Sequence, residues 1–257
     1  MVDLRLGDCL IELDSIPAGS MDMVLCDLPY GTTVCSWDVV LPFDKLWSHY
    51  WRVLKEDGVV VLFGTEPFTS MMIMSCLEFY RQKLTWLKTR PTNVFNAKKQ
   101  FMNWTEDIVV FYRRLPTFHP QMRTDGEFTG RKVQRRNHDR SGGVFGQTGE
   151  RRDYIHEGNG GLFYPRSVLE FSNVQKSSEC YHPTQKPVAL CEYLIRTYTD
   201  EGDIVLDPFV GSGTTVVAGV NTGRNCIGIE MDDIIYQPAR RRVENANKLV
   251  QTKKTDT

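Results

Sequence analysis

The sequence lacks the marks of several protein classes. None of its seven cysteines forms a C-x-x-C pair, and their odd number and wide spacing suit neither a disulfide framework nor a zinc site. No apolar run approaches the ~18 residues that a membrane span needs. The first eight residues include acids and no apolar stretch, unlike a secretory signal. We therefore expect a reducing, cytosolic setting, with no bound metal and no membrane.

Two common nucleotide-binding signatures are also missing. The glycine-containing segment 207–215 reads Asp-Pro-Phe-Val-Gly-Ser-Gly-Thr-Thr and has no Gly-Lys-Ser/Thr, so it is not a Walker A loop. Val216 stands where the third glycine of a G-x-G-x-x-G pattern would be. This spacing disfavours a nicotinamide dinucleotide, and a dehydrogenase is a disfavoured alternative.

Charge divides the 257 residues into three parts. Residues 113–176 hold 12 basic and 7 acidic residues, whereas 1–112 hold 10 and 14, and 177–257 hold 9 and 11. The middle part is also rich in Gly and Arg and has no long apolar periodicity. Such a basic, loop-rich insertion suits a phosphate backbone, and a solvated surface excursion is the alternative. We expect 1–112 and 177–257 to form one domain that carries 113–176 as an insertion.

Both flanks alternate apolar runs with helical periodicity, which predicts an α/β fold with a mostly parallel sheet and helices on both faces. The expected strands are 2–6, 23–26, 59–63, 82–87, 107–112, 204–206 and 225–229. The expected helices are 41–54, 71–77, 187–199, 214–221 and 234–247, followed by a frayed tail at 253–257.

Acidic residues follow several of these strands. Asp27, Asp207 and Glu230 come directly after apolar runs, and Asp8 follows another through Gly7. In an open α/β sheet, ligands bind beyond the carboxyl ends of the strands, where an acid can accept from hydroxyls or amines. Each acid alone could equally cap a helix, and the four together favour a binding site.

The segment Asp27-Leu-Pro-Tyr30 is the second unusual feature of the sequence. It places a carboxylate, backbone carbonyls and one aromatic ring at the end of a buried strand. An exocyclic amine on a planar base needs acceptors for its N–H groups and a ring on which to stack. A plain turn with a packed tyrosine is the alternative.

These segments resemble S-adenosylmethionine-dependent DNA amino-methyltransferases. Asp27-Leu-Pro-Tyr30 is similar to their [D/N/S]-P-P-[Y/F/W] motif, 207–214 to their cofactor loop, and His182-Pro-Thr-Gln-Lys-Pro187 to the segment upstream of that loop. The order of the three motifs is the circularly permuted order of the beta class. The resemblance therefore implies a Rossmann-like methyltransferase fold with that permuted order, and target recognition by 113–176.

The resemblance also implies roles for individual residues. Asp27 and the Leu28 carbonyl would accept from the target amine, beside Pro29, and Tyr30 would stack on a flipped base. The expected cofactor contacts are Asp8, Thr184, Gln185, Lys186, Asp207, Phe209, Gly211, Ser212, Gly213, Thr214 and Glu230. The expected nucleic-acid contacts are Trp37, Lys88, Arg90, Lys98, Arg131, Arg135 and Arg136.

The first residue of the Asp27-Leu-Pro-Tyr30 motif indicates the target base. Asp27 favours adenine N6 in this family, where Ser usually marks cytosine N4, and the Pro-Cys pair of cytosine ring-carbon enzymes is absent. Leu28 departs from the usual proline but keeps the backbone carbonyl. The leading hypothesis is a DNA adenine N6-methyltransferase. A cytosine N4 enzyme, an RNA amino-methyltransferase and a non-catalytic DNA-binding relative remain alternatives.

The resemblance further implies partners and a setting. Double-stranded DNA is the expected substrate, in the cytoplasm of a bacterial, archaeal or phage-infected cell. A homodimer and a cognate restriction endonuclease are left open, as are orphan and phage-borne enzymes.

Overall fold

The computed structural model describes residues 1–31, 41–92, 94–124, 162–174 and 185–255. The predictions for Trp37, Arg131, Arg135, Arg136 and Thr184 lie outside these ranges. The chain divides into one unit of 1–119 with 166–257 and a second unit of 120–165. Among the described residues of the second unit, Arg123 and Phe163 form an antiparallel bridge.

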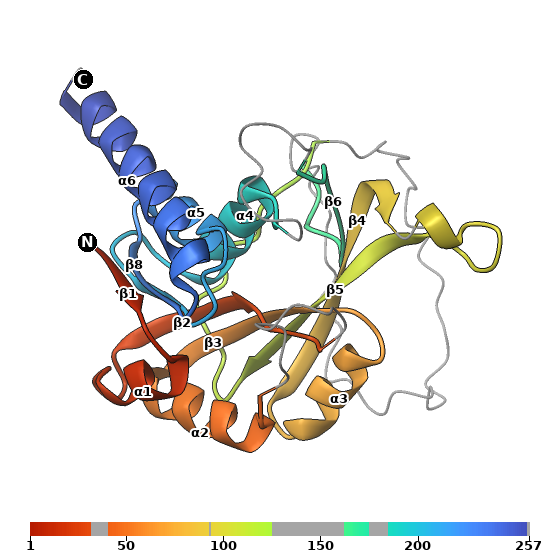
Figure 1. Ribbon diagram of the computed structural model, residues 1–257, viewed down its shortest axis with the longest axis horizontal. Coiled ribbons are helices and arrows are strands. Elements are labelled where there is room, and N and C mark those ends of the chain that lie inside the picture. Colours follow the sequence, from red (N-terminus) through yellow and green to blue (C-terminus); the bar gives the residue numbers. More distant parts are fainter. Residues whose placement is uncertain (32–40, 93, 125–161, 175–184, 256–257) are drawn as a thin grey trace, which may run out of the picture. The chain divides into compact units, whose positions relative to one another are not determined.

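The larger unit is built on an eight-stranded sheet with six α-helices and one 3-10 turn in its described part (Figure 1). In chain order the elements are β1 Val2–Leu6, α1 Cys9–Asp14, β2 Met21–Asp27, α2 Phe43–Val53, β3 Leu54–Gly64, α3 Phe68–Ser75, β4 Tyr80–Thr92, η1 Val94–Asn96, β5 Asn103–Tyr112, β6 Val168–Phe171, α4 Val188–Tyr198, β7 Ile204–Asp207, α5 Thr214–Asn221, β8 Asn225–Glu230 and α6 Asp233–Thr255.

The strand order is β1-β8-β7-β2-β3-β5-β4-β6. Only β5 runs against its neighbours, because its pairings with β3 and β4 are antiparallel and the other pairings are parallel. The prediction of a mostly parallel α/β sheet is therefore confirmed. The reversal of β5 brings its amino end to the edge at which the other strands end.

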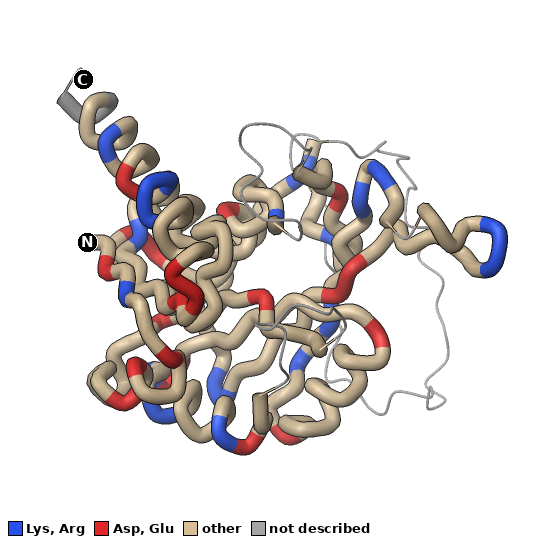
Figure 2. The backbone as a smooth tube through the Cα atoms, viewed as in Figure 1, with Lys and Arg blue, Asp and Glu red and all other residues tan. Residues whose placement is uncertain are grey.

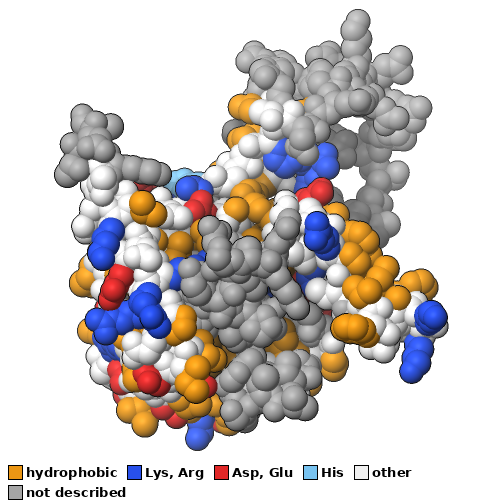
Figure 3. Space-filling model, turned by 45° about the horizontal axis from the view of Figure 1, so that its top comes forward, with side chains coloured by type: hydrophobic (Ala, Val, Ile, Leu, Met, Phe, Trp, Pro, Cys, Tyr) orange, Lys and Arg blue, Asp and Glu red, His pale blue; other side chains and the backbone are white. Residues whose placement is uncertain are grey.

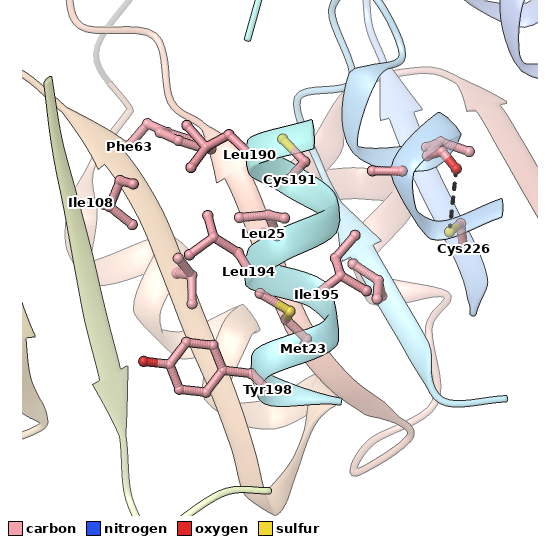
Figure 4. Close-up of a cluster of buried hydrophobic side chains, with 14 of the residues drawn as sticks. Met23, Leu25, Phe63, Ile108, Leu190, Cys191, Leu194, Ile195, Tyr198 and Cys226 are labelled. Carbon is pink, nitrogen blue, oxygen red and sulfur yellow. Dashed lines mark hydrogen bonds between the residues drawn. The ribbon is translucent and has the colours of Figure 1, made fainter. Parts of the chain in front are cut away.

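Each face of the sheet is covered by helices from a different part of the chain. Alternate residues of β2 point to opposite faces, as in any strand. Met23 and Leu25 belong to the cluster that includes α4, α5 and α6, whereas Val24 and Cys26 belong to the cluster that includes α1, α2 and α3. Figure 4 shows α4 lying over the first of these clusters. Both faces are apolar, so the central strands read as continuous hydrophobic runs.

Several element boundaries differ from those predicted. The prediction of a frayed tail from residue 253 is wrong for 253–255, because helix α6 continues to Thr255. Strand β3 begins at Leu54 and not at 59 as predicted, and its pairing with β2 shifts register between Met21 and Met23. Strand β6, of four residues, and helix α1, of six, are not among the predicted elements. Strand β6 pairs with β4, so residues 168–171 belong to the main sheet, although we had placed them in the insertion.

The cysteines in the described part of the chain are free. Cys9, Cys26, Cys191 and Cys226 are buried and Cys76 is partly exposed. No group of three or more His, Cys, Asp or Glu that could hold a metal lies among the described residues. Among those residues, no helix is long and apolar enough to cross a membrane.

Candidate active site

Four acidic residues meet at the carboxyl edge of the sheet. Asp27, Asp207 and Glu230 are the last residues of β2, β7 and β8, and Asp8 follows β1. Leu6 is in register with Glu230. The parallel strands therefore end together, as the sequence predicted. Asp8 also caps α1 by accepting from the Leu10 N–H at 2.8 Å, so its helix-cap role is real; its role in binding stays a prediction.

The loop after β7 is held open by two glycines and one carboxylate. Gly211 and Gly213 have φ angles of 52° and 81°, which residues with a side chain rarely adopt. Glu230 accepts from the Gly211 N–H through Oε2 and from the Asp232 N–H through Oε1, each at 2.9 Å. Among the described residues, only the Phe209 carbonyl lies within 4 Å of a Cβ placed on Gly211. The loop thus leaves room for a ligand at Gly211.

The back of the same loop is fixed by an arginine that the sequence did not single out. Arg242 on α6 donates to the Ser212 carbonyl at 2.9 Å and to the Thr214 hydroxyl at 3.1 Å. Thr214 also donates to the Lys186 carbonyl at 3.2 Å. The only sequence signal for Arg242 was the basic character of the last helix.

Burial shapes the charge of this edge. Asp207 is almost fully buried and accepts from the Phe209 N–H at 3.0 Å, and burial raises the pKa of its carboxyl to about 7. Burial also raises the pKa of Glu230, against hydrogen bonds from the backbone that lower it. A cation bound here would favour the ionised form of both acids.

The carboxylate of Asp27 already has a donor on each oxygen. Tyr30 donates its hydroxyl to Oδ1, and Lys186 donates its ammonium to Oδ2. The Lys186 side chain is 8% exposed, and its ammonium lies 5.3 Å from the centre of the Phe63 ring. The resemblance places Lys186 near the cofactor, and this stays a prediction. Its side chain joins the predicted catalytic acid, and its carbonyl accepts from Thr214 of the loop.

A second carboxylate, Glu106, extends this pair into a chain of alternating charges. Its Oε2 lies 3.3 Å from the Lys186 ammonium, and its Oε1 lies 2.7 Å from that of Lys88. Burial raises the pKa of Glu106, but Lys186 and Lys88 outweigh burial and hold it below its ordinary value. Burial lowers the pKa of Lys186, and Asp27 and Glu106 more than reverse this, raising it to about 12. Glu106 and Lys186 are therefore charged near neutral pH.

Lys88 does not fit the predicted contact with phosphate. Its side chain is 3% exposed, paired with Glu106 and 5.6 Å from the centre of the Trp86 ring. We correct that prediction, because a buried and paired ammonium cannot reach a nucleic acid. Glu106 was missed for a related reason. It lies near the amino end of β5, whereas ligand-binding acids in α/β sheets are expected after the carboxyl ends of strands.

The rest of the Asp27-Leu-Pro-Tyr30 segment is anchored from both sides. Leu28 is buried in the cluster with α1, α2 and α3, which accounts for a large apolar residue where the family usually has proline. The ring of Tyr30 lies 4.9 Å from that of Phe68 at 40°. Pro29 is partly exposed between them. The segment is thus held at the sheet edge with Asp27 at its base.

The remaining predicted contacts lie in different places. Gln185 is partly exposed beside Lys186. Arg90 and Lys98 are exposed on the hairpin formed by β4, η1 and β5. The sequence motifs thus converge on one edge. Of the predicted nucleic-acid contacts that are described, Arg90 and Lys98 share the hairpin and Lys88 is buried.

Comparison with known proteins identifies the family of the chain. A family model described as DNA methylase (N6_N4_Mtase) matches residues 21–241, which contain both motifs and the glycine loop. The chain belongs to the N6_N4 DNA methylase family. The methylase is 28% identical over 273 residues to the DNA adenine methyltransferase YhdJ of Escherichia coli K12, covering 98% of this chain and 87% of YhdJ. It is 29% identical to the type II methyltransferase M.HpaI of Haemophilus parainfluenzae, covering 95% of this chain and 75% of M.HpaI.

Solved structures support the fold of the methylase. A complex of M1.HpyAVI with SAM has a TM-score of 0.64 at 22% identity, covering 95% of this chain and 99% of that one. The PvuII DNA methyltransferase, which is cytosine-N4-specific, has a TM-score of 0.66 at 16% identity, covering 97% and 92%. The methylase therefore has the Rossmann-like α/β fold of these methyltransferases.

Proposed function

We propose that the methylase transfers a methyl group from S-adenosylmethionine to the exocyclic N6 of adenine in duplex DNA, after the base has been flipped out of the helix. The observation that carries this proposal is the placement of Asp27 and Tyr30 at the same sheet edge as the glycine loop and Glu230. That edge combines an amine acceptor with a ligand-binding loop.

The chemistry of the edge fits this cofactor. When bound, S-adenosylmethionine supplies a methyl group on a positively charged sulfur. Glu230 and Asp8 offer carboxylate oxygens for hydroxyl and adenine groups, and the loop from Asp207 to Thr214 leaves space at Gly211. The relative M1.HpyAVI, whose structure holds SAM, has the same fold. Asp207, Phe209 and Gln185 are proposed to line the amino-acid side.

Asp27 and the Leu28 carbonyl are proposed to accept the two N–H groups of the target amine. The lone pair of this amine is delocalised into the base, so the amine is a poor nucleophile. Two acceptors draw the hydrogens away from the methyl donor and leave the lone pair facing it. Positioning then supplies most of the acceleration, and no covalent nucleophile is required.

Tyr30 is proposed to stack on the flipped base. Base–aromatic stacking contributes about 1–3 kcal/mol per base, which offsets part of the cost of unpairing. The ring rests on Phe68, so it stands on a packed support. Burial and Asp27 raise the pKa of the Tyr30 hydroxyl, which keeps it protonated and a donor.

Adenine is the proposed base because Asp27 is the first motif residue and because YhdJ, the adenine methyltransferase, aligns over nearly the whole chain. Cytosine N4 is the second candidate. Its amine offers the same two hydrogens to Asp27 and Leu28, and a cytosine-N4-specific enzyme shares the fold.

The hairpin between β4 and β5 is a proposed part of the DNA surface. Residues 89–105 contain Arg90, Lys98 and Lys99 and no acid. Phe95 and Phe101 are fully exposed there. Figure 2 shows basic residues at the tip of this hairpin, and Figure 3 shows apolar side chains gathered behind it. Cations on phosphates with apolar rings against bases are a common combination in DNA binding.

Other features complete the proposal. The insertion is proposed to recognise the target sequence. DNA in the cytoplasm of a bacterial, archaeal or infected cell is the proposed substrate, and a restriction endonuclease is a possible partner, as the name of the type II relative M.HpaI suggests.

Nucleoside mass spectrometry tests this function. The purified protein is incubated with S-adenosylmethionine and unmethylated genomic DNA, which is then digested. N6-methyladenine is the expected product. N4-methylcytosine would overturn only the base. If neither product forms and RNA is also unmodified, catalysis is contradicted, and a non-catalytic DNA-binding relative becomes the better interpretation.

A further inference from the structure

The Lys186 ammonium lies between two carboxylates that differ in their hydrogen bonding. It donates a hydrogen bond to Asp27 and lies 3.3 Å from Glu106 Oε2. That Glu106 oxygen is buried and has no hydrogen-bond partner among the described residues. A buried carboxylate oxygen without a donor is unfavourable, so the site contains one unfilled acceptor beside a donor.

The state of Asp27 makes this arrangement relevant to catalysis. Both of its oxygens already have donors, from Tyr30 and from Lys186. Each oxygen can accept one further hydrogen bond, but a target amine is bound more weakly while the Lys186 ammonium neutralises the charge of the same carboxylate. The Lys186 side chain is 8% exposed, so water cannot replace a lost carboxylate partner. If Lys186 leaves Asp27, it needs another anion within reach.

We propose that Glu106 is a positioning residue that receives Lys186 when the target base enters, so that Asp27 presents its full negative charge to the amine. This inference rests on the proposed function. The shift keeps the ammonium paired throughout, because Glu106 Oε2 is already in contact distance. Lys88 holds the other oxygen of Glu106 at 2.7 Å and so keeps Oε2 directed at Lys186.

The first test is Glu106→Gln against Asp107→Asn. Asp107 is the next residue of β5 and pairs with Lys83 at 3.0 Å, so its substitution removes the same charge from the same strand without touching Lys186. We expect Glu106→Gln to lower kcat/KM for unmethylated DNA by about 10- to 100-fold, because Lys186 stays on Asp27. S-adenosylmethionine affinity should change by less than about twofold in both variants. Asp107→Asn should keep wild-type kcat/KM.

A double-mutant cycle with Lys186→Met separates positioning from a merely structural role. If Glu106 acts through Lys186, adding Glu106→Gln to Lys186→Met should cause no further loss of kcat/KM. If the losses of kcat/KM from Glu106→Gln and Lys186→Met instead add in the double variant, the proposal is overturned. Lys88→Met/Glu106→Gln removes a buried pair together, and it carries the same expectation if Glu106→Gln alone does not fold.

The outcomes distinguish this inference from the function on which it rests. A wild-type chain that methylates no nucleic acid overturns both. Normal wild-type activity with Glu106→Gln equal to Asp107→Asn overturns only the shift of Lys186. A structure of the complex with a flipped base should show the Lys186 ammonium closer to Glu106 than to Asp27, and the reverse order would contradict the proposal.

Discussion

Lys186 donates a hydrogen bond to Asp27 across 159 residues of chain, and the two belong to different sequence motifs. Asp27 ends β2 on one side of the insertion, and Lys186 precedes α4 on the other. The pair therefore joins the predicted catalytic segment to the segment upstream of the cofactor loop.

Replacing Asp27 with alanine should abolish methylation, by at least about 1000-fold, because the main amine acceptor is lost. The fold should survive, since Lys186 keeps Glu106 as a partner. Tritium transfer from labelled cofactor to DNA measures the loss, and calorimetry measures cofactor affinity. Asp22→Asn, on the same strand, is the matched control. Full activity in Asp27→Ala would remove Asp27 from the reaction.

Two substitutions of Tyr30 separate the contribution of its ring from that of its hydroxyl. Tyr30→Phe keeps the stacking surface and loses the hydrogen bond to Asp27, so kcat/KM should fall by less than about tenfold. Tyr30→Ala removes the ring and should cost about 10- to 100-fold. Affinity for DNA with a mismatched, already unpaired target base reports stacking and should fall only in Tyr30→Ala. Equal effects of the two substitutions would argue against stacking.

The buried carboxyl of Asp207 predicts a pH dependence of stability. Its pKa is raised to about 7 by burial, so the folded chain holds a proton that the unfolded chain has released. Stability without cofactor should therefore fall as pH rises from about 4 to 7, by on the order of 4 kcal/mol at full ionisation. Urea unfolding at several pH values measures this. Asp207→Asn should flatten the fall, and an unchanged slope would contradict the assignment.

The hairpin predicts a salt effect on DNA binding. Lys98→Gln/Lys99→Gln should reduce the slope of log affinity against log salt by about 2, because each lysine releases about one counterion from DNA. Lys45→Gln/Lys248→Gln, two exposed lysines on α2 and α6, is the control for net charge. Fluorescence anisotropy at several salt concentrations gives the slopes. Parallel slopes for both double variants would exclude the hairpin from the DNA surface.

The sequence predicted those parts of the site that depend on strand ends and motifs. Asp27, Asp207 and Glu230 follow apolar runs, and a parallel sheet brings such ends together. Glu106 could not be found in this way, because β5 is reversed and offers its amino end to the same edge. Arg242 was missed because a basic helix does not reveal which arginine points inward. Lys88 resembled a surface cation because its partner Glu106 was not recognised.

The strand order has a consequence for how the chain folds as it is made. Strands β8 and β7 lie between β1 and β2 in the sheet, yet they are synthesised last. Until they emerge from the ribosome, β2 has an unpaired edge and β1 has no neighbour, and both present bare backbone groups to other chains. The sheet cannot be completed until β7 and β8 have been synthesised. Slow translation of these two strands should therefore increase aggregation and dependence on chaperones.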